Sequence, residues 1–186
     1  MLVVVVTPPA GLVSYTLAKK HLRLEETDDS EKELIEAYIA AATAWIDGPT
    51  GWLGRTILSQ TLELRCNTFA GAAVLPYGPA TEIVSVKYIS PIGIEEILGA
   101  DSYEIVAGGL SLKDGASWPS LRGDAEGVRV QYRSGGDTAP GSIQQAVLLL
   151  IGQWFRNRMA VNTGNLSVTE MPFGVEALLA PFRTWR

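Results

Sequence analysis

The chain has 186 residues, with 15 Lys and Arg against 20 Asp and Glu, so its formal net charge at pH 7 is −5. That length fits one domain, or one with an inserted subdomain, and the acidic balance excludes a protein that grips DNA mainly through counterion release. One cysteine and one histidine exclude an internal disulfide and a Cys/His zinc cluster, and such cysteine usage is typical of an intracellular chain.

The N-terminal segment Leu2–Val6 is apolar but is too short for a signal-peptide core, lacks a basic start and stops at two prolines. It predicts an edge strand or an extended arm, and no membrane segment. The next segment, Leu12–Leu24, is predicted to be a short amphipathic helix centred on Leu17–Arg23, with Leu17 and Leu22 among basic residues.

A longer helix is predicted over Ser30–Ile46. Ser30 and Glu33 match an S-x-x-E capping box at its start, and Gly48 with the following proline ends it. The helical repeat predicts a core face made of these residues: Leu34, Ile35, Tyr38, Ile39, Ala42, Trp45 and Ile46.

The middle of the chain changes to a period of two, which indicates half-buried antiparallel strands. Apolar residues alternate with polar ones along 62–66, 84–88 and 128–132. Turns are predicted at Ser90–Gly93 and at Gly108-Gly109. Cys66 lies on the apolar side of its strand, so it is interpreted as an inert core thiol. Together these features predict a small antiparallel β-unit over about Gln60–Arg133.

The second long helix is predicted over Ser142–Arg158, with Ser142 and Gln145 as another capping box. Its core stripe consists of Ile143, Val147, Leu150, Ile151, Trp154 and Phe155. Leu148 and Leu149 widen the apolar surface beyond that stripe, so the helix is expected to pack on two sides. We expect Trp154 and Phe155 to be buried, and Leu148 or Leu149 to lie at an interface with another copy of the protein.

After this helix, Asn157–Glu170 is polar and is expected to form a mobile loop in an isolated subunit. A short helix is predicted over Val175–Phe182. The density of apolar side chains near the end requires a partner or the chain's own core to bury them, and both alternatives stay open. In the first case, the residues that dock on a partner are Phe173, Leu178, Leu179, Phe182, Trp185 and Arg186.

No catalytic group emerges from the sequence. The simpler interpretation of the lone His21 is a structural role. The acidic run Glu25–Asp29 precedes a helix, where the helix dipole favours negative charge. Neither this run nor Glu95 with Glu96 has metal-ligand spacing. We therefore expect no enzyme activity, no cofactor and no metal, although a carboxylate-dependent hydrolase remains an alternative.

Four segments in their order carry a family resemblance: Leu17–Gly51, Leu75–Ile89, Ile143–Val161 and Met171–Arg183. They resemble the head–tail connector proteins, also called adaptor or head-completion proteins, of long-tailed bacteriophages and phage-derived gene transfer agents. The resemblance spans nearly the whole chain. One departure is Ser90–Gly93, where such proteins would have an Asp/Gly-rich hairpin tip.

The resemblance implies a virion structural protein of the head–tail junction, made in the cytoplasm of the host bacterium. It implies a ring, usually of twelve copies, that docks beneath the portal protein, extends the DNA channel and presents the surface on which a stopper or tail-terminator protein docks. It implies no catalysis. DNA would pass without sequence-specific binding, so Arg156 and Arg158 are interpreted as structural or partner-facing. A monomeric interaction module or assembly chaperone of the same pathway remains an alternative.

The expected fold class is α+β. Residues 12–56 and 142–186 would form a helical body of about four helices, and residues about 57–135 would form an inserted antiparallel β-unit within a single connector domain.

Overall fold

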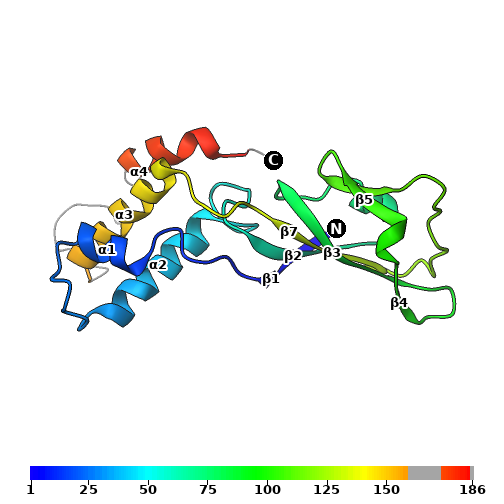
Figure 1. Cartoon of the computed structure of the whole chain (residues 1–186), viewed down its shortest axis with the longest axis horizontal. Coiled ribbons are helices and arrows are strands. Elements are labelled where there is room, and N and C mark those ends of the chain that lie inside the picture. Colours follow the sequence, from blue (N-terminus) through cyan, green and yellow to red (C-terminus); the bar gives the residue numbers. More distant parts are fainter. Residues whose placement is uncertain (159–172, 185–186) are drawn as a thin grey trace. The chain divides into compact units, whose positions relative to one another are not determined.

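The computed structural model describes residues 1–158 and 173–184. Its contacts divide the chain into two compact units (Figure 1). The β-unit comprises Met1–Ala10 and Arg55–Asp137, and the helical unit comprises Gly11–Gly54 and Thr138–Arg186. The combination of separate helices and antiparallel sheets confirms the predicted α+β class. The N-terminal segment, which the sequence left outside both predicted bodies, belongs to the β-unit.

The main sheet of the β-unit has five antiparallel strands. In spatial order they are β1 (Leu2–Thr7), β2 (Gln60–Cys66), β7 (Val128–Ser134), β3 (Ala80–Ile89) and β4 (Glu95–Ile97). The alternating pattern fixes the register because it places apolar residues opposite one another, as in the pairs Leu62–Tyr132 and Leu64–Val130. The strands predicted from period two are confirmed, and the N-terminal segment is an edge strand rather than a free arm.

A core covers one face of this sheet. Over it lie the hairpin of β5 (Tyr103–Val106) and β6 (Gly109–Leu112) and a 3-10 turn at Phe69–Ala72. The core consists of Leu62, Leu64, Cys66, Phe69, Ala72, Leu75, Val86, Tyr103, Leu110, Val128, Val130 and Tyr132. The predicted hairpin is present, but its turn lies at Ala107-Gly108, with φ of +49° and +78°, one residue before the predicted Gly108-Gly109.

The helical unit contains α1 (Tyr15–His21), α2 (Lys32–Ile46), α3 (Gly141–Arg156) and α4 (Phe173–Leu179), followed by a 3-10 turn at Ala180–Phe182. The predicted helices are therefore present, although each begins or ends a few residues away from its predicted limits. The apolar stripes of α2 and α3 form the core, and α3 packs against α1, α2 and α4. The largest fully buried side chains of this unit are Ile35, Ile46, Leu53, Ile143, Leu150, Ile151 and Leu179.

Both predicted capping boxes are wrong. The amide of Ser30 donates to the Asp28 carboxylate at 3.0 Å, so this serine belongs to the preceding turn and α2 begins at Lys32. The helix α3 begins at Gly141, one residue before Ser142, with Pro140 at its N-cap. In the described chain neither N-cap position forms a side-chain capping hydrogen bond. A local side-chain contact and a proline replaced the expected caps.

Candidate interaction surfaces

The helix α3 was expected to offer Leu148 and Leu149 to a second copy of the protein. Leu148 is only 6% exposed, whereas Leu149 is 39% exposed. The sequence suggested a neighbouring copy as the second packing partner of α3, but this helix already packs against α1, α2 and α4 of the same chain. Leu148 is therefore a core residue, and of the two leucines Leu149 is the one that leaves apolar surface for a neighbour.

The end of α3 is less deeply buried than expected. Trp154 and Phe155 are both half-buried, so the prediction that they are buried is wrong for the chain by itself. Trp154 lies against the Tyr38 ring, with centroids 5.9 Å apart. The Arg158 guanidinium lies 4.6 Å from the Phe155 ring centroid and forms a 2.8 Å ion pair with Glu31. These contacts give Arg158 a structural role within its own unit.

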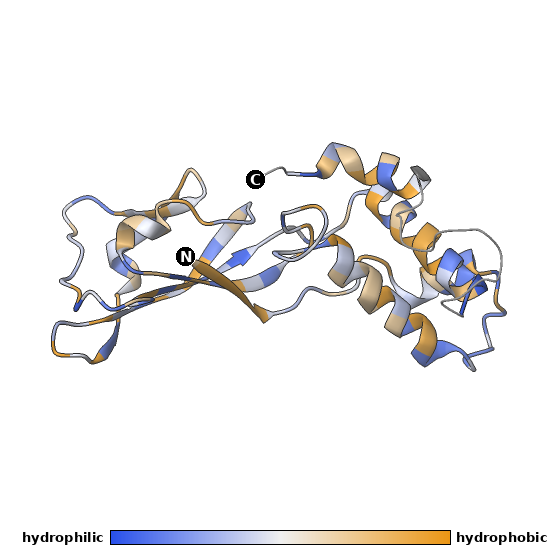
Figure 2. Cartoon of the chain, turned by 180° about the vertical axis from the view of Figure 1, so that it is seen from behind, coloured by the Kyte–Doolittle hydropathy of each residue, from blue (hydrophilic) through white to orange (hydrophobic). Residues whose placement is uncertain are grey.

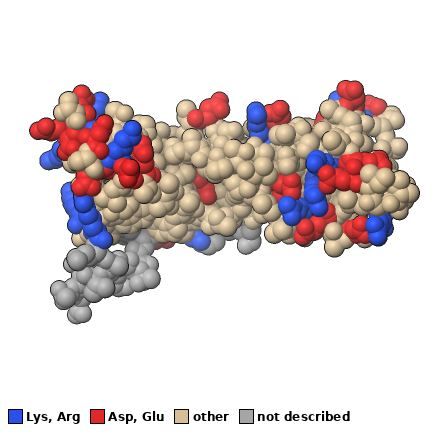
Figure 3. Space-filling model, turned by 90° about the horizontal axis from the view of Figure 1, so that it is seen from below, with Lys and Arg blue, Asp and Glu red and all other residues tan. Residues whose placement is uncertain are grey.

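The helix α2 carries an exposed apolar stripe that the sequence reasoning missed. Beyond Glu36, every exposed residue of α2 is uncharged. We call the set the α2 stripe: Ala37, Ala40, Ala41, Ala44 and Trp45. Trp45, expected in the core, is 38% exposed. In Figure 3 the charged side chains of the helical unit gather at one end, beside an area without charge.

The spacing of the α2 stripe is i, i+3, i+4, i+7 and i+8, on the side of α2 opposite its buried residues. That spacing was visible in the sequence, but the helical repeat was used only to locate the core face, to which Trp45 was assigned. Small side chains let a second helix approach closely, and a partly exposed tryptophan supplies contact area.

The C-terminal segment is partly built into the helical unit. Val175 is 1% exposed and Leu179 is fully buried, so Leu179 is a core residue rather than a free docking residue. The Thr184 amide donates to the Leu53 carbonyl at 2.9 Å, and the Arg183 guanidinium lies 4.1 Å from the Trp52 ring centroid.

The other predicted docking residues divide into two groups. Leu178 and Phe182 are half-buried and keep apolar surface available. Phe173 begins α4, and Trp185 and Arg186 lie outside the described residues. The loop predicted over Asn157–Glu170 lies outside the described residues from residue 159 onward.

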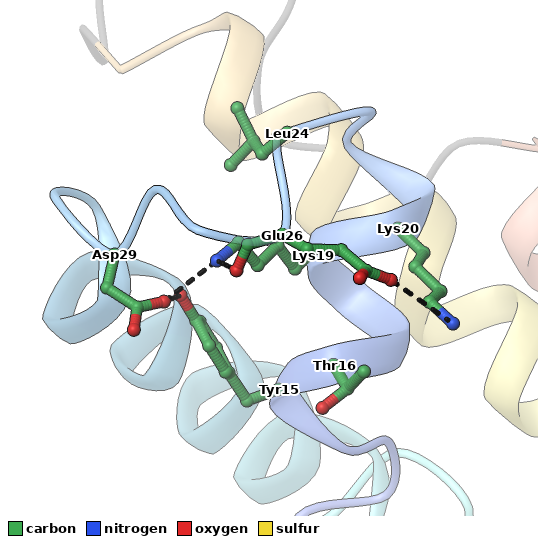
Figure 4. Close-up of a pocket in the computed structure, with 7 residues that line it drawn as sticks. All are labelled: Tyr15, Thr16, Lys19, Lys20, Leu24, Glu26 and Asp29. Atoms are coloured by element: carbon green, nitrogen blue, oxygen red, sulfur yellow. Dashed lines mark hydrogen bonds and ion pairs between the residues drawn. The ribbon is translucent and has the colours of Figure 1, made fainter.

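A small pocket of about 340 Å³ lies where α1 meets the acidic connection to α2 (Figure 4). The predicted apolar side of α1 is wrong here, since Leu17 is 37% exposed while Lys19 is only 5% exposed. The Lys19 ammonium donates to the Asp29 carboxylate and to the Glu26 carbonyl, each at 2.8 Å, and the Tyr15 hydroxyl donates to Asp29 at 2.7 Å. Lys19 thus ties the connection to α1.

The pKa values in this pocket oppose acid–base catalysis near neutral pH. The hydrogen bond from Lys19, followed by that from Tyr15, holds the pKa of the Asp29 carboxyl below its usual value. The same bonds raise the pKa of Lys19 and of the Tyr15 hydroxyl. Each group is held in the protonation state it already has at pH 7, so the cluster is structural. His21, the other candidate catalytic residue, is half-buried close to Gly152 of α3.

The second face of the sheet carries interleaved charges. Glu63 is 8% exposed and accepts hydrogen bonds from Arg65 at 2.7 Å and from Gln131 at 2.8 Å. Burial raises the pKa of Glu63, but the hydrogen bonds from Gln131 and Arg65 outweigh it and lower the pKa overall. Glu95 bridges Lys87 at 3.0 Å and Arg129 at 3.1 Å. The cations Arg65, Lys87 and Arg129 of this face are therefore paired with carboxylates.

The described residues contain no group of three or more His, Cys, Asp or Glu side chains arranged to hold a metal ion. Within the same residues, none of the helices is both long enough and apolar enough to cross a membrane. Cys66 is buried, as predicted, and burial raises the pKa of its thiol.

An α2 stripe, an exposed Leu149 and a partly covered C-terminal segment are typical of a protein that packs against other proteins in an assembly. The chain belongs to the head completion protein family, whose model matches residues 11–183. This assignment confirms the resemblance on which the sequence analysis relied.

The chain is also similar to solved structures of gene transfer agent (GTA) particles. A chain from the neck of an empty GTA particle, computed with C6 symmetry, is 26% identical with a TM-score of 0.71. Chains from the virion of a native GTA particle and from the neck of a native particle, computed with C12 symmetry, are each 24% identical, with TM-scores of 0.66 and 0.65. Each match covers 100% of this chain and 97% of the other. The two at 24% identity show the fold alone. No curated protein matches.

Proposed function

We propose that this chain is a structural subunit of the neck of a phage or phage-like particle, where copies form a ring of twelve at the head–tail junction. The ring docks beneath the portal protein, extends the DNA channel and provides the attachment surface for a stopper or tail-terminator protein. Support comes from membership of the head completion family and from similarity to a chain of a GTA neck. Membership of a structural family also favours a role without catalysis.

The observation that carries the ring proposal is the uncharged exposed surface of the helical unit. A cyclic ring needs two different, complementary surfaces on each subunit, because every subunit contacts its two neighbours through different sides. The α2 stripe is smooth and offers close approach, whereas Leu149 on α3 is a projecting aliphatic side chain. We assign these two features to the contact between neighbouring copies.

The C-terminal segment is the proposed contact with a neighbouring ring. Val175 and Leu179 anchor α4 in its own unit, so the docking surface is formed by Leu178 and Phe182, which remain half-buried, together with Phe173, Trp185 and Arg186. Removing only Trp185 and Arg186 keeps the Thr184–Leu53 hydrogen bond, and we expect that truncation to leave the subunit folded while reducing the joining of heads to tails.

The net charge of −5 fits a channel through which DNA slides. Like charge repels phosphates, and the basic residues of the sheet face are paired with carboxylates. Filter binding of the isolated protein to duplex DNA at physiological salt should therefore be weak, and submicromolar affinity would contradict this part of the proposal.

The proposal is tested by assembly with the portal ring of the same particle. Size-exclusion chromatography with light scattering should show the chain joining portal in equal copy number, and particles lacking the chain should contain filled heads without tails. A chain that stays monomeric beside intact portal rings, with head–tail joining unaffected by its deletion, would overturn the proposal. An assembly chaperone would instead be needed for assembly but absent from finished particles.

A further inference from the structure

The outer edge of β1 lacks the features that usually protect an edge strand. Natural edge strands carry lysine, proline or inward-facing charge, or are very short, because unpaired backbone groups invite another strand. The six residues of β1 contain no charge and no proline, and Leu2, Val5 and Val6 are 46%, 42% and 47% exposed. Figure 2 shows β1 hydrophobic along its length. A register shift lies between Val5 and Thr7, so Leu2–Val5 remains regular.

The opposite edge of the same sheet, β4, has only three residues, but its outward backbone groups are open to pairing. Its two carboxylates are held within their own sheet, Glu95 by Lys87 and Arg129 and Glu96 by the Tyr88 hydroxyl at 2.7 Å. These paired carboxylates therefore oppose the approach of another strand less than unpaired charges would. The outward apolar side chains are Ile94, 55% exposed, and Ile97, 69% exposed.

The backbone of β4 has groups available for a further strand. The Ser90 amide donates to the Ile94 carbonyl at 2.9 Å, and the Leu98 amide donates to the Val86 carbonyl at 2.8 Å. In an antiparallel pair, residues alternate between those that bond the partner strand and those that point away from it. The backbone groups that point toward β3 therefore belong to Ile94, Glu96 and Leu98. The amides and carbonyls of Glu95 and Ile97 point outward.

We propose that β1 of one subunit pairs with β4 of the neighbouring copy, so that the sheets join edge to edge around the ring. This inference rests on the proposed function, because it names a contact between ring subunits. β1 and β4 are the two unpaired edges of the five-stranded sheet in the described chain, and they are different surfaces, as a cyclic contact requires.

The topology fixes the polarity of the new pair. Each strand of the sheet is antiparallel to the next, so the first and the fifth strands, β1 and β4, run in the same direction. Neighbours that keep the same orientation about the ring axis therefore join β1 and β4 in parallel. The register through Lys87, Arg129 and Arg65 places Ile97 and Leu2 at the same level on the same sheet face. The proposal therefore includes a joint without stagger between copies, in which these two exposed side chains meet.

A pair of β1 edges from two copies is the main competing arrangement. It would be a two-fold contact that uses the same surface on both subunits and yields closed dimers. The parallel joint uses β1 and β4 equally, so variants of the two edges should have the same effect. That equality separates the two arrangements.

The test places a lysine on each edge in the full-length protein. Leu2→Lys and Ile97→Lys put charge on side chains that are already exposed, so the subunit should remain folded. Val74→Lys is the matched control, since Val74 is a 71% exposed apolar residue of the same unit away from both edges. Rings are counted by native mass spectrometry and electron microscopy after assembly with the portal ring. Each edge lysine should lower the ring population about tenfold or more, and Val74→Lys should not.

Two further measurements sharpen the test. The double variant Leu2→Lys with Ile97→Glu should recover rings, because opposite charges then meet across the joint. Ile97→Pro removes an outward amide while leaving the bonds to β3, so it should block rings too. Hydrogen exchange should show that the β1 amides that point away from β2, and the amides of Glu95 and Ile97, become protected upon assembly.

The outcomes separate this inference from the proposed function. Rings that form normally with both edge lysines overturn the joint while leaving the ring intact, and so does a dimer that only Leu2→Lys disrupts. A wild-type protein that forms no ring, even with portal present, refutes the proposed function and this inference with it.

Discussion

Two adjacent leucines of α3 should respond in opposite ways to substitution. Leu148 is 6% exposed and Leu149 is 39% exposed, although they are neighbours in the sequence. Leu148→Ala removes buried methyl groups and leaves a cavity, which costs about 2 to 5 kcal/mol of the free energy of unfolding. Leu149→Asp changes a side chain at the surface of the isolated subunit, so the expected loss of folding stability is about 0.5 kcal/mol.

For ring assembly we expect the substitution of Leu149 to have the larger effect. Fully burying a leucine contributes about 1.5 to 3 kcal/mol, so burying the remaining 39% of Leu149 contributes about 1 kcal/mol to each contact, or about a fivefold change in its equilibrium constant. Leu149→Ala should weaken each contact between copies by about that free energy. Leu149→Asp should block assembly altogether, because an aspartate without a partner would be desolvated in the contact.

Urea unfolding of the subunit and light scattering of the ring measure the two effects separately. If Leu149→Asp assembled as the wild type does, Leu149 would not lie between copies. If Leu148→Ala cost less than about 1 kcal/mol, the packing of α3 against α4 would be looser than the structure has it.

Three further predictions concern stability. The Tyr132 hydroxyl donates to the buried Pro76 carbonyl at 2.6 Å, so Tyr132→Phe should cost about 1 to 3 kcal/mol in urea unfolding, and a neutral result would mean that water replaces the bond. A Cβ on Gly109 would collide with the Ala73 carbonyl, whereas one on Gly108 would meet no atom but would sit at a φ of +78°, which costs an L-residue about 1 to 2 kcal/mol. Gly109→Ala should therefore destabilise the protein more than Gly108→Ala, and equal effects would contradict the close packing of the β5–β6 hairpin. Folding lowers the pKa of Asp29, so its ionised carboxylate contributes to folding stability above its usual pKa of 3.8. This contribution is lost as the pH falls through the lower pKa that Asp29 has in the folded protein. Asp29→Asn should thus flatten the acid limb of stability below about pH 4, and an acid limb as steep as that of the wild type would show that other carboxylates set it.

The sequence predicted the strands well because one face of the sheet is buried and the other is not. Alternation along Leu62–Cys66 and Val128–Tyr132 satisfies that geometry only as a strand with its apolar residues toward the core, so pattern alone located both strands and their buried face. The helices were found for a similar reason. Their starts were not, because Asp28 and Pro140 compete locally with the serine caps, and such competition depends on contacts outside the motif.

The candidate surfaces were harder to predict than the fold. A leucine on α3 beyond the main stripe can face the chain's own helices or a neighbouring copy, and only the positions of those helices distinguish Leu148 from Leu149. Lys19 shows the converse problem, since a lysine is expected outside and this one is buried by its bonds to Asp29 and Glu26. The α2 stripe was missed because alanine fits both a core and an exposed face.

The central claim is that copies of this chain form a ring at the head–tail junction. Electron cryomicroscopy of the neck of purified particles tests it most directly. We predict a ring of this chain in contact with the portal, with Leu149 and the α2 stripe buried between neighbouring copies. A neck in which this chain is absent, or one in which Leu149 and the α2 stripe face solvent in every copy, would contradict the account.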